Sequence, residues 1–222
     1  MKVVIVSGGN PPPENLLLSQ IENADIIIGA DSGCDTLIKY NITPTYIIGD
    51  FDSNQSDLSI LLKKGAKKYI FEKEKDKTDS ELAFELAKKD GVKEIIGLGM
   101  TGTRYDHTLA NFGLLKIALD HNIIMQIIDE NNKIFLTSKS MELIGQPGDI
   151  ISFQSYTNEV TDFCIKNAKY ELNKYNMKIG DSRTVSNEFV ETSIEISFSS
   201  GIVMVIYSKD WKNKKRVVKY NN

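Results

Sequence analysis

Two carboxylates stand two residues apart at Asp50 and Asp52, directly after a short apolar run at residues 46–48. In a strand, this spacing directs both side chains to one face, and a loop after the strand can bend them around a single ion. Paired carboxylate oxygens beside Gly49 suit Mg²⁺ that carries phosphate groups. The same residues also fit a solvated acidic turn, and the segment alone does not decide between the two.

Further aspartates follow other apolar runs in the same half of the chain, at Asp31, Asp79 and Asp106. Each has a structural alternative. Asp31 and Asp106 can cap helices, and the helix dipole favours an acidic residue such as Asp79 in a first turn. If the runs are parallel strands, however, their carboxyl ends share one edge, where carboxylates repel one another unless cations intervene. The set therefore predicts a site for a metal ion and polyphosphate.

Groups that can bind phosphate accompany these carboxylates. The turn at residues 29–33 is built of small residues, which allows backbone N–H groups to approach phosphate. A glycine-rich segment at residues 97–102 leads to Arg104, whose guanidinium can bind phosphate oxygens, and Asp106 can cap a helix, orient Arg104 or bind metal. His107 alone is more often a structural or surface residue. The Walker signature is absent, and the dinucleotide-binding glycine fingerprint does not follow the first predicted strand. Such an enzyme must therefore rely on carboxylate-held metal and scattered basic groups.

The elements that position these residues are predicted from apolar periodicity. Strands are expected at residues 3–7, 25–30, 46–49, 68–71, 94–98 and 123–128, because each is a short and nearly continuous apolar run. A helix is expected at residues 79–90, with a Thr78–Glu81 capping box and Gly91 as its stop, and a second helix at 106–121. This alternation predicts an α/β domain with a mostly parallel sheet over residues 1–130.

The pattern changes near residue 130. Short strand-like runs are expected at residues 133–137, 140–143, 150–154, 159–165, 192–198 and 202–207, separated by glycine-containing turns. Their spacing predicts an all-β C-terminal domain over residues 131–222, either a β-sandwich or a small barrel. The lysine-rich end of the chain is interpreted as a solvated tail, with weak attraction to an anionic substrate as the alternative.

Composition excludes several functions. The 222 residues carry a net charge of −3, so no overall basic field favours nucleic acid. No apolar stretch is long enough for a membrane span, and no signal peptide is expected. Cys34 and Cys164 are far apart and show no metal-binding spacing. Reduced thiols and a cytoplasmic location are therefore expected.

Several blocks of the sequence together resemble the thiamine pyrophosphokinase family. They are Ala-Asp-Ser-Gly at residues 30–33, Ile-Gly-Asp-Phe-Asp-Ser at 48–53, Asp-Lys-Thr-Asp at 76–79, Gly-Thr-Arg-Tyr-Asp-His at 102–107 with Asn111, and Ser-Asn-Glu at 186–188. Their order and spacing agree with the family from Val3 to Tyr207. The Gly-Asp-Phe-Asp-Ser and Arg-x-Asp-His blocks carry most of the specificity.

The resemblance implies an α/β catalytic domain, a C-terminal β-sandwich, a homodimer, and transfer of pyrophosphate from ATP to the thiamine hydroxyl, which gives thiamine diphosphate and AMP. It implies Mg²⁺ bound by Asp50, Asp52 and Asp79, with Asp52, Asp79 and Arg104 as the catalytic residues. The implied ATP-binding residues are Asp31, Ser32, Lys77, Thr78, Arg104, Asp106 and His107. Thiamine contacts are implied for Tyr170, Ser186 and Asn187, where an aromatic face suits a cationic thiazolium.

Two other functional classes are considered from the residues alone. One is a Mg²⁺-dependent transferase or phosphohydrolase that acts on another alcohol or nucleotide. The other is a nucleotide-binding module without catalytic activity. The number of mutually repelling carboxylates disfavours the second, since a simple binding protein has no need of them.

Overall fold

The computed structural model describes residues 1–49, 56–69, 77–89 and 91–209, and it divides the chain into two compact units, Met1–Glu130 and Asn131–Asn222. The first unit is built on a parallel sheet with strand order β6-β5-β1-β2-β3-β4. Its strands are β1 (Lys2–Val6), β2 (Ile26–Ala30), β3 (Tyr46–Ile48), β4 (Lys67–Tyr69), β5 (Glu94–Leu98) and β6 (Ile124–Ile128). The strands predicted in this half are confirmed to within one or two residues over the described part of the chain.

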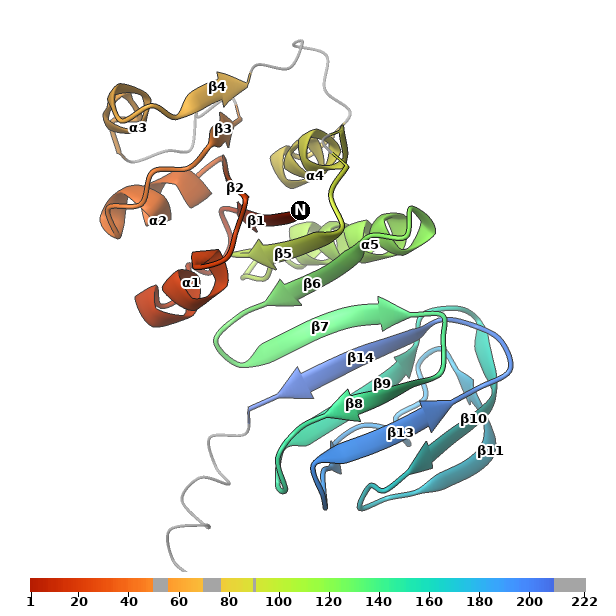
Figure 1. Ribbon diagram of the computed structural model, residues 1–222. Helices are drawn as coiled ribbons and strands as arrows, with labels where there is room; N and C mark the ends of the chain where they lie inside the picture. Colours follow the sequence, from red (N-terminus) through yellow and green to blue (C-terminus); the bar gives the residue numbers. More distant parts are fainter. Residues whose placement is uncertain (50–55, 70–76, 90, 210–222) are drawn as a thin grey trace, which may run out of the picture. The chain divides into compact units, whose positions relative to one another are not determined.

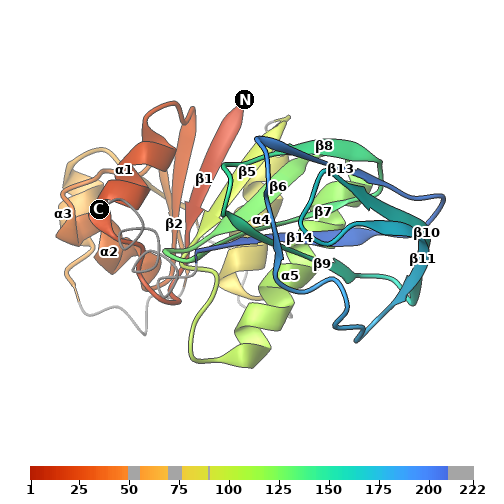
Figure 2. The ribbon, with the colours of Figure 1, turned by 90° about the horizontal axis from the view of Figure 1, so that it is seen from below.

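Helices cover both faces of this sheet. The helices α1 (Glu14–Ile21), α2 (Gly33–Lys39) and α3 (Ser59–Lys63) lie on one side, and α4 (Asp79–Lys89) and α5 (Tyr105–Asp120) lie on the other (Figures 1 and 2). Val4 and Val6 of β1 pack in one buried cluster with Leu17 of α1. Alternate residues of the same strand are also fully buried, as expected for a strand covered on both faces.

The two predicted helices are confirmed, with one correction at the start of α4. The backbone N–H of Glu81 donates to the Thr78 hydroxyl over 3.3 Å, which is one half of the capping box. The carboxylate of Glu81 instead forms an ion pair with Lys77 at 3.3 Å. After α4, Gly91 adopts a φ of +71°, which suits glycine at a helix stop.

The second unit consists of two antiparallel sheets, with strand orders β12-β9-β14-β7 and β11-β10-β13-β8. Its strands are β7 (Asn132–Thr137), β8 (Met141–Ile144), β9 (Ile150–Ser155), β10 (Glu159–Lys166), β11 (Leu172–Lys178), β12 (Asn187–Glu188), β13 (Ser193–Ser197) and β14 (Val203–Ser208). The six predicted strands and the β-sandwich are present. Strands β11 and β12 were not predicted.

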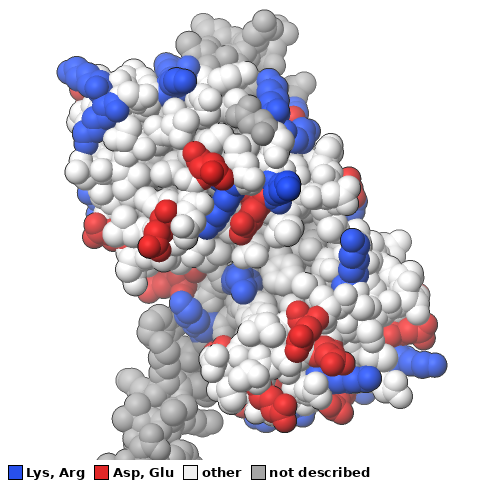
Figure 3. Space-filling view, in the orientation of Figure 1, with Lys and Arg blue, Asp and Glu red and all other residues white. Residues whose placement is uncertain are grey.

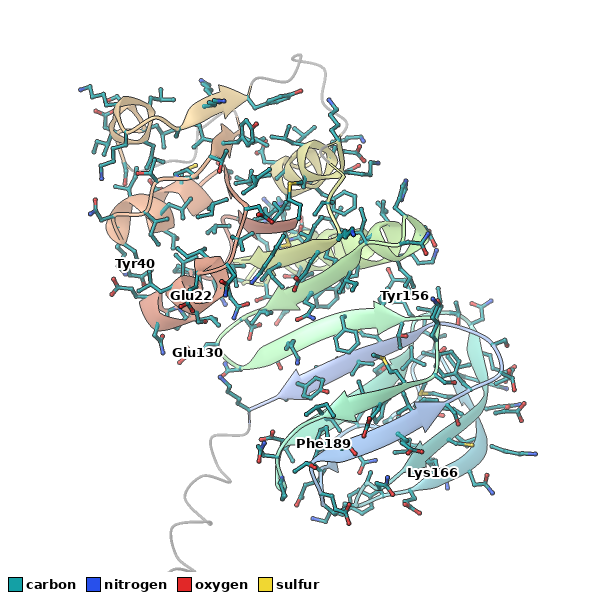
Figure 4. All side chains as sticks on the ribbon, in the orientation of Figure 1. Glu22, Tyr40, Glu130, Tyr156, Lys166 and Phe189 are labelled. Atoms are coloured by element: carbon teal, nitrogen blue, oxygen red, sulfur yellow. The ribbon has the colours of Figure 1, made fainter. Side chains whose placement is uncertain are left out.

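Aromatic side chains fill the interior of the second unit. The rings of Phe153 and Phe163 meet edge to face at 5.5 Å between centroids, and Phe189, labelled in Figure 4, stacks on Tyr207 at 5.9 Å. Burial raises the pKa of Tyr207 to about 12, and its hydroxyl donates to the carbonyl of Ile144. None of the helices in the described part of the chain has the length and apolar content of a membrane span.

Candidate active site

A pocket of about 560 Å³ opens at the carboxyl ends of β1, β2 and β5 in the first unit. It is lined by the ends of these strands and by the first turns of α4 and α5. The lining residues are 7–10, 30–32, 77–80, 99–104, 107, 108 and 111. Ligands of open α/β sheets bind at this edge because loops and helix starts converge there.

Two glycine-containing loops form the backbone of the pocket. The N–H of Gly9 donates to the carbonyl of Gly99 and the N–H of Asn10 to that of Thr101, both over 2.7 Å. A Cβ atom on Gly9 would lie 2.3 Å from the Thr101 oxygen, so a larger residue would separate the loops. Gly99 itself has a φ of +63°. The loops after β1 and β5 therefore form a single surface.

Side chains from neighbouring elements hold the loop after β5. The buried side chain of Asn111 on α5 donates to the carbonyl of Met100 over 2.8 Å. The hydroxyl of Thr101 donates to the carboxylate of Asp129, at the end of β6, over 3.0 Å. A loop fixed in this way can present its backbone groups to a ligand without a large loss of entropy on binding.

Asp31 stands at the end of β2 with a backbone φ of +49°, which is uncommon for a residue other than glycine. Its N–H donates to the carbonyl of Ile48, and its own carbonyl accepts from Cys34 in the first turn of α2. The next residue, Ser32, donates its hydroxyl to the carbonyl of Gly8 over 3.4 Å. Backbone in sparsely populated conformations is concentrated at functional sites, where the surrounding structure maintains it.

The first turns of α4 and α5 both contribute to the pocket, through Thr78, Asp79 and Ser80 and through Arg104, His107 and Thr108. The N-terminus of a helix attracts anions because its first N–H groups have no partner within the helix. Two such ends at one pocket favour a ligand with several negative charges. The carboxylates of Asp31 and Asp79 at the same pocket favour a cation beside it.

Arg104 precedes α5 and forms a two-point ion pair with Asp106. Its Nε and Nη2 atoms donate to the Asp106 oxygens over 3.2 and 2.6 Å, while the two side chains remain 69% and 65% exposed. Hydrogen bonding to Arg104 lowers the pKa of Asp106, and the same contact raises the pKa of Arg104. Because the pair is exposed to water, it orients the guanidinium more than it stabilises the fold.

The structure gathers most of the predicted nucleotide-site residues at this pocket: Asp31, Ser32, Lys77, Thr78, Asp79, Arg104 and His107. Asp106 is not among the lining residues. Of the three roles considered for it, the structure supports the orientation of Arg104, which bonds to Asp106 over 2.6 Å. Arg104, and not Asp106, stands at the N-cap of α5. Asp50 and Asp52 lie outside the described residues. Sequence reasoning missed the loop at residues 7–10 and also Ser80.

The predicted thiamine-contacting residues belong to the second unit, where Asn187 is 2% exposed and Tyr170 is 60% exposed. The Asn187 Oδ1 atom accepts from the N–H groups of Tyr170 and Glu188 over 3.0 and 2.9 Å, and its Nδ2 atom donates to the Tyr170 carbonyl over 2.8 Å. Ser186 has a φ of +60°, and its N–H donates to the Ser152 hydroxyl. Asn187 thus fixes the backbone that carries the exposed ring of Tyr170.

Charged side chains of both signs are interspersed over the face of the molecule seen in Figure 3. Lys77, at the edge of the pocket, forms ion pairs with Glu81 and Glu85 at 3.3 and 3.8 Å. Among the residues described here, no group of three or more His, Cys, Asp or Glu side chains is arranged to hold a metal ion. Asp31 and Asp79 are the described carboxylates that line the pocket.

Comparison with known proteins identifies the family. Residues 17–127 match the model of the thiamin pyrophosphokinase catalytic domain, and residues 136–203 match the model of the thiamin pyrophosphokinase vitamin B1 binding domain. This chain belongs to the thiamin pyrophosphokinase family. The thiamine pyrophosphokinase of Bacillus subtilis is 32% identical over 217 residues, which cover 95% of this chain and 100% of that protein.

Solved structures of the family have the same fold. A crystal structure of thiamine pyrophosphokinase from Bacillus subtilis superposes with a TM-score of 0.84 at 29% identity, covering 95% of this chain and 100% of that one. The Geobacillus thermodenitrificans thiamin pyrophosphokinase gives a TM-score of 0.81 at 29% identity, covering 95% and 99%. The match extends over both units, so the fold prediction and the resemblance found in the sequence are confirmed.

Proposed function

We propose that this protein transfers a pyrophosphoryl group from ATP to the hydroxyl of thiamine and releases thiamine diphosphate and AMP. The observation that carries the proposal is the pocket at the ends of β1, β2 and β5, where two helix N-termini, two carboxylates and an arginine meet. Membership of the thiamin pyrophosphokinase family supports the choice of substrates. In the reaction, the thiamine hydroxyl oxygen bonds to the β-phosphorus of ATP, the bond from that phosphorus to the α,β-bridging oxygen breaks, and a carboxylate accepts the hydroxyl proton.

The first unit binds the triphosphate in this proposal. Backbone N–H groups at the starts of α4 and α5 orient the phosphates, with Ser32, Thr78 and His107 along the wall of the nucleotide site. Arg104 stabilises negative charge on the transferred group when its guanidinium turns from Asp106 to phosphate oxygens. In the absence of ligand the contact with Asp106 keeps the guanidinium at the edge of the pocket.

The donor set at the pocket fits Mg²⁺. Asp31 and Asp79 supply carboxylate oxygens and the neighbouring Ser and Thr residues supply hydroxyls, and this ion prefers hard oxygen ligands. In the proposal Asp79 holds Mg²⁺ together with Asp50 and Asp52, with Asp31 nearby. When bound, the ion neutralises phosphate charge. Asp52 or Asp79 accepts the proton of the thiamine hydroxyl.

The second unit supplies the thiamine contacts in this proposal. Tyr170 offers an exposed aromatic face, which attracts a cationic thiazolium ring. Ser186 lies next to Asn187, and Asn187 acts by holding Tyr170 in place. The proposal thus assigns Asn187 a positioning role in thiamine binding.

The proposal includes a homodimer and a cytoplasmic location, where ATP is supplied. Exposed apolar side chains on the second unit, including Ile144, Ile179 and Val190, support association through that unit. Sedimentation equilibrium tests the dimer, and a mass equal to that of one chain at all micromolar concentrations would refute it.

The test of the activity is a single assay with purified protein, ATP, MgCl₂ and thiamine, with the products separated by ion-exchange chromatography. We expect thiamine diphosphate and AMP in equal amounts. ADP with thiamine monophosphate would indicate a different phosphotransfer. Nucleotide binding without any product would indicate a binding module.

Asp79→Asn is the informative variant for this assay, and Asp120→Asn is its matched control. Asp120 is an exposed aspartate at the end of α5 that pairs with Lys116 and lies outside the pocket. We expect the first variant to lose turnover and the second to keep it. Equal activities in the two variants would exclude Asp79 from the metal site.

A further inference from the structure

Two serine hydroxyls meet at the pocket, one from the end of β1 and one from the first turn of α4. Ser80 Oγ donates to Ser7 Oγ over 2.9 Å, and the bond joins residues 73 positions apart in the sequence. Both residues line the pocket. Strand β1 and helix α4 are packing neighbours in the first unit (Figure 1).

Ser7 is a rigid partner for this contact. It is 3% exposed, and its backbone N–H donates to the carbonyl of Leu98 over 2.8 Å. A Cβ atom on Gly99 would lie 2.2 Å from the Ser7 carbonyl oxygen, so the backbone of the β5 loop packs directly on Ser7. The Ser7 hydroxyl therefore has the fixed position of the central strands.

The first turn of α4 benefits from such an anchor. Ser80 directly follows Asp79 in the chain, so a shift of the Ser80 backbone also moves the Asp79 backbone. The capping contacts of this turn are local: Glu81 donates to the Thr78 hydroxyl and Leu82 to the Thr78 carbonyl. Local bonds preserve helical shape but do not fix the turn against the sheet, and helix ends are the first parts of a helix to open.

The direction of the bond leaves one donor unused. A serine hydroxyl has one hydrogen to donate, and Ser7 acts as the acceptor from Ser80. Within the described part of the chain, the Ser7 hydroxyl has no acceptor for its own hydrogen. A buried donor without a partner at a ligand pocket is a place where a ligand oxygen binds well, because the unpaired donor is costly until it is satisfied.

We propose that Ser7 and Ser80 form a positioning pair. Ser80 anchors the first turn of α4, and with it Asp79, to β1, and Ser7 donates its hydroxyl hydrogen to an oxygen of the bound polyphosphate. The second part rests on the proposed function, since it requires ATP at this pocket. The anchor rests on the contact alone.

The anchor is tested without any ligand, by amide hydrogen exchange in the full-length protein. Ser80→Ala should raise the exchange rates of the Glu81 and Leu82 amides about threefold to tenfold, as expected for loss of one neutral hydrogen bond. Ser80→Thr keeps the hydroxyl and should exchange within about twofold of the wild type. Ser19→Ala is the matched control, because the Ser19 hydroxyl is exposed on α1 and donates to Leu16 of its own helix. Wild-type exchange in Ser80→Ala, or equal acceleration in the Ala and Thr variants, would overturn the anchor.

The phosphate contact is tested by calorimetric titration with Mg²⁺ and the α,β-methylene analogue of ATP, in which the bond to be broken is replaced. Ser7→Ala should weaken binding about tenfold to one-hundredfold, as for a hydrogen bond to a charged group, and Ser80→Ala about threefold to tenfold. The double variant should bind as Ser7→Ala does, because the hydroxyls act in series. Binding by Ser7→Ala within twofold of the wild type would overturn the phosphate contact. Failure of the wild type itself to bind the analogue would overturn the nucleotide proposal together with that contact, while the exchange experiment would still decide the anchor.

Discussion

Replacing Asn187 with alanine removes three hydrogen bonds from one buried side chain. Two backbone N–H groups, those of Tyr170 and Glu188, lose their acceptor, and the Tyr170 carbonyl loses a donor. Each bond contributes about 0.5–1.5 kcal/mol net, which sets the upper limit of the loss for three bonds at about 4.5 kcal/mol. Because Tyr170 is 60% exposed, water can replace part of its hydrogen bonding. We therefore expect a loss of about 2 kcal/mol in the free energy of unfolding.

The same variant should affect substrate binding selectively. Without Asn187 the Tyr170 backbone loses two hydrogen bonds. The ring then spends less time in the position that the proposed function gives it for thiamine binding. We expect KM for thiamine to rise about threefold to tenfold, within the range of a weakened cation–π contact, and KM for ATP to stay unchanged. Urea unfolding followed by circular dichroism measures the stability, and initial rates with each substrate varied measure the KM values.

Asn173→Ala is the matched control for this prediction. Asn173 is an exposed asparagine of β11 in the same unit, and its side-chain oxygen has only a weak contact with the Cys164 thiol at 3.8 Å. It should leave both stability and KM near wild type. If Asn187→Ala has the unfolding free energy and the thiamine KM of the wild type, the assignment of Asn187 as the residue that positions Tyr170 is refuted.

Three other predictions concern the pocket and the thiols. Arg104→Ala should lower kcat/KM for ATP by roughly 30-fold to 1,000-fold while the unfolding free energy stays unchanged. Arg104→Lys should restore only part of the activity because the planar guanidinium is lost. Full activity in both variants would make the arginine a structural residue. Asp79→Asn should raise the Mg²⁺ concentration needed for half-maximal activity or abolish turnover, and its circular dichroism spectrum should stay unchanged. An unchanged Mg²⁺ dependence would contradict the role of Asp79 as a metal ligand. Burial raises the pKa of Cys34 to about 12, so its reactive thiolate is scarce below that pH, and Ellman's reagent at pH 8 should titrate Cys164 in the native protein and Cys34 only after unfolding. Rapid reaction of two thiols in the native state would show that Cys34 is accessible.

Strands and long helices were predictable because their signals are local. The central strand β5 (Glu94–Leu98) was predicted with its observed bounds, since a continuous apolar run between polar turns identifies a strand covered on both faces. Strand β11 (Leu172–Lys178) was missed because it lies at the edge of its sheet and Met177 is its one fully buried residue. A strand of that kind has neither an apolar run nor an alternating pattern to identify it.

Some residues of the candidate site were also predictable from local sequence, and others were not. Asp31, Asp79 and Arg104 were predicted because charged residues at strand ends and helix starts have few structural explanations in combination. The loop at residues 7–10 was missed because its role depends on the loop after β5, and only the neighbouring positions of β1 and β5 in the sheet bring the two together. The hydrogen bonds of Asn187 with the Tyr170 backbone could not be inferred either, since whether an asparagine faces a ligand or the backbone depends on contacts distant in sequence.

The left-handed backbone of Asp31 has a consequence for protein engineering. A residue other than glycine at a φ of +49° carries a conformational cost of order 1 kcal/mol, and glycine would relieve it. A directed-evolution experiment that selects only for heat resistance would therefore favour Asp31→Gly and would remove a carboxylate from the pocket in the same step. Libraries built on this scaffold should keep position 31 fixed or select for turnover together with thermostability.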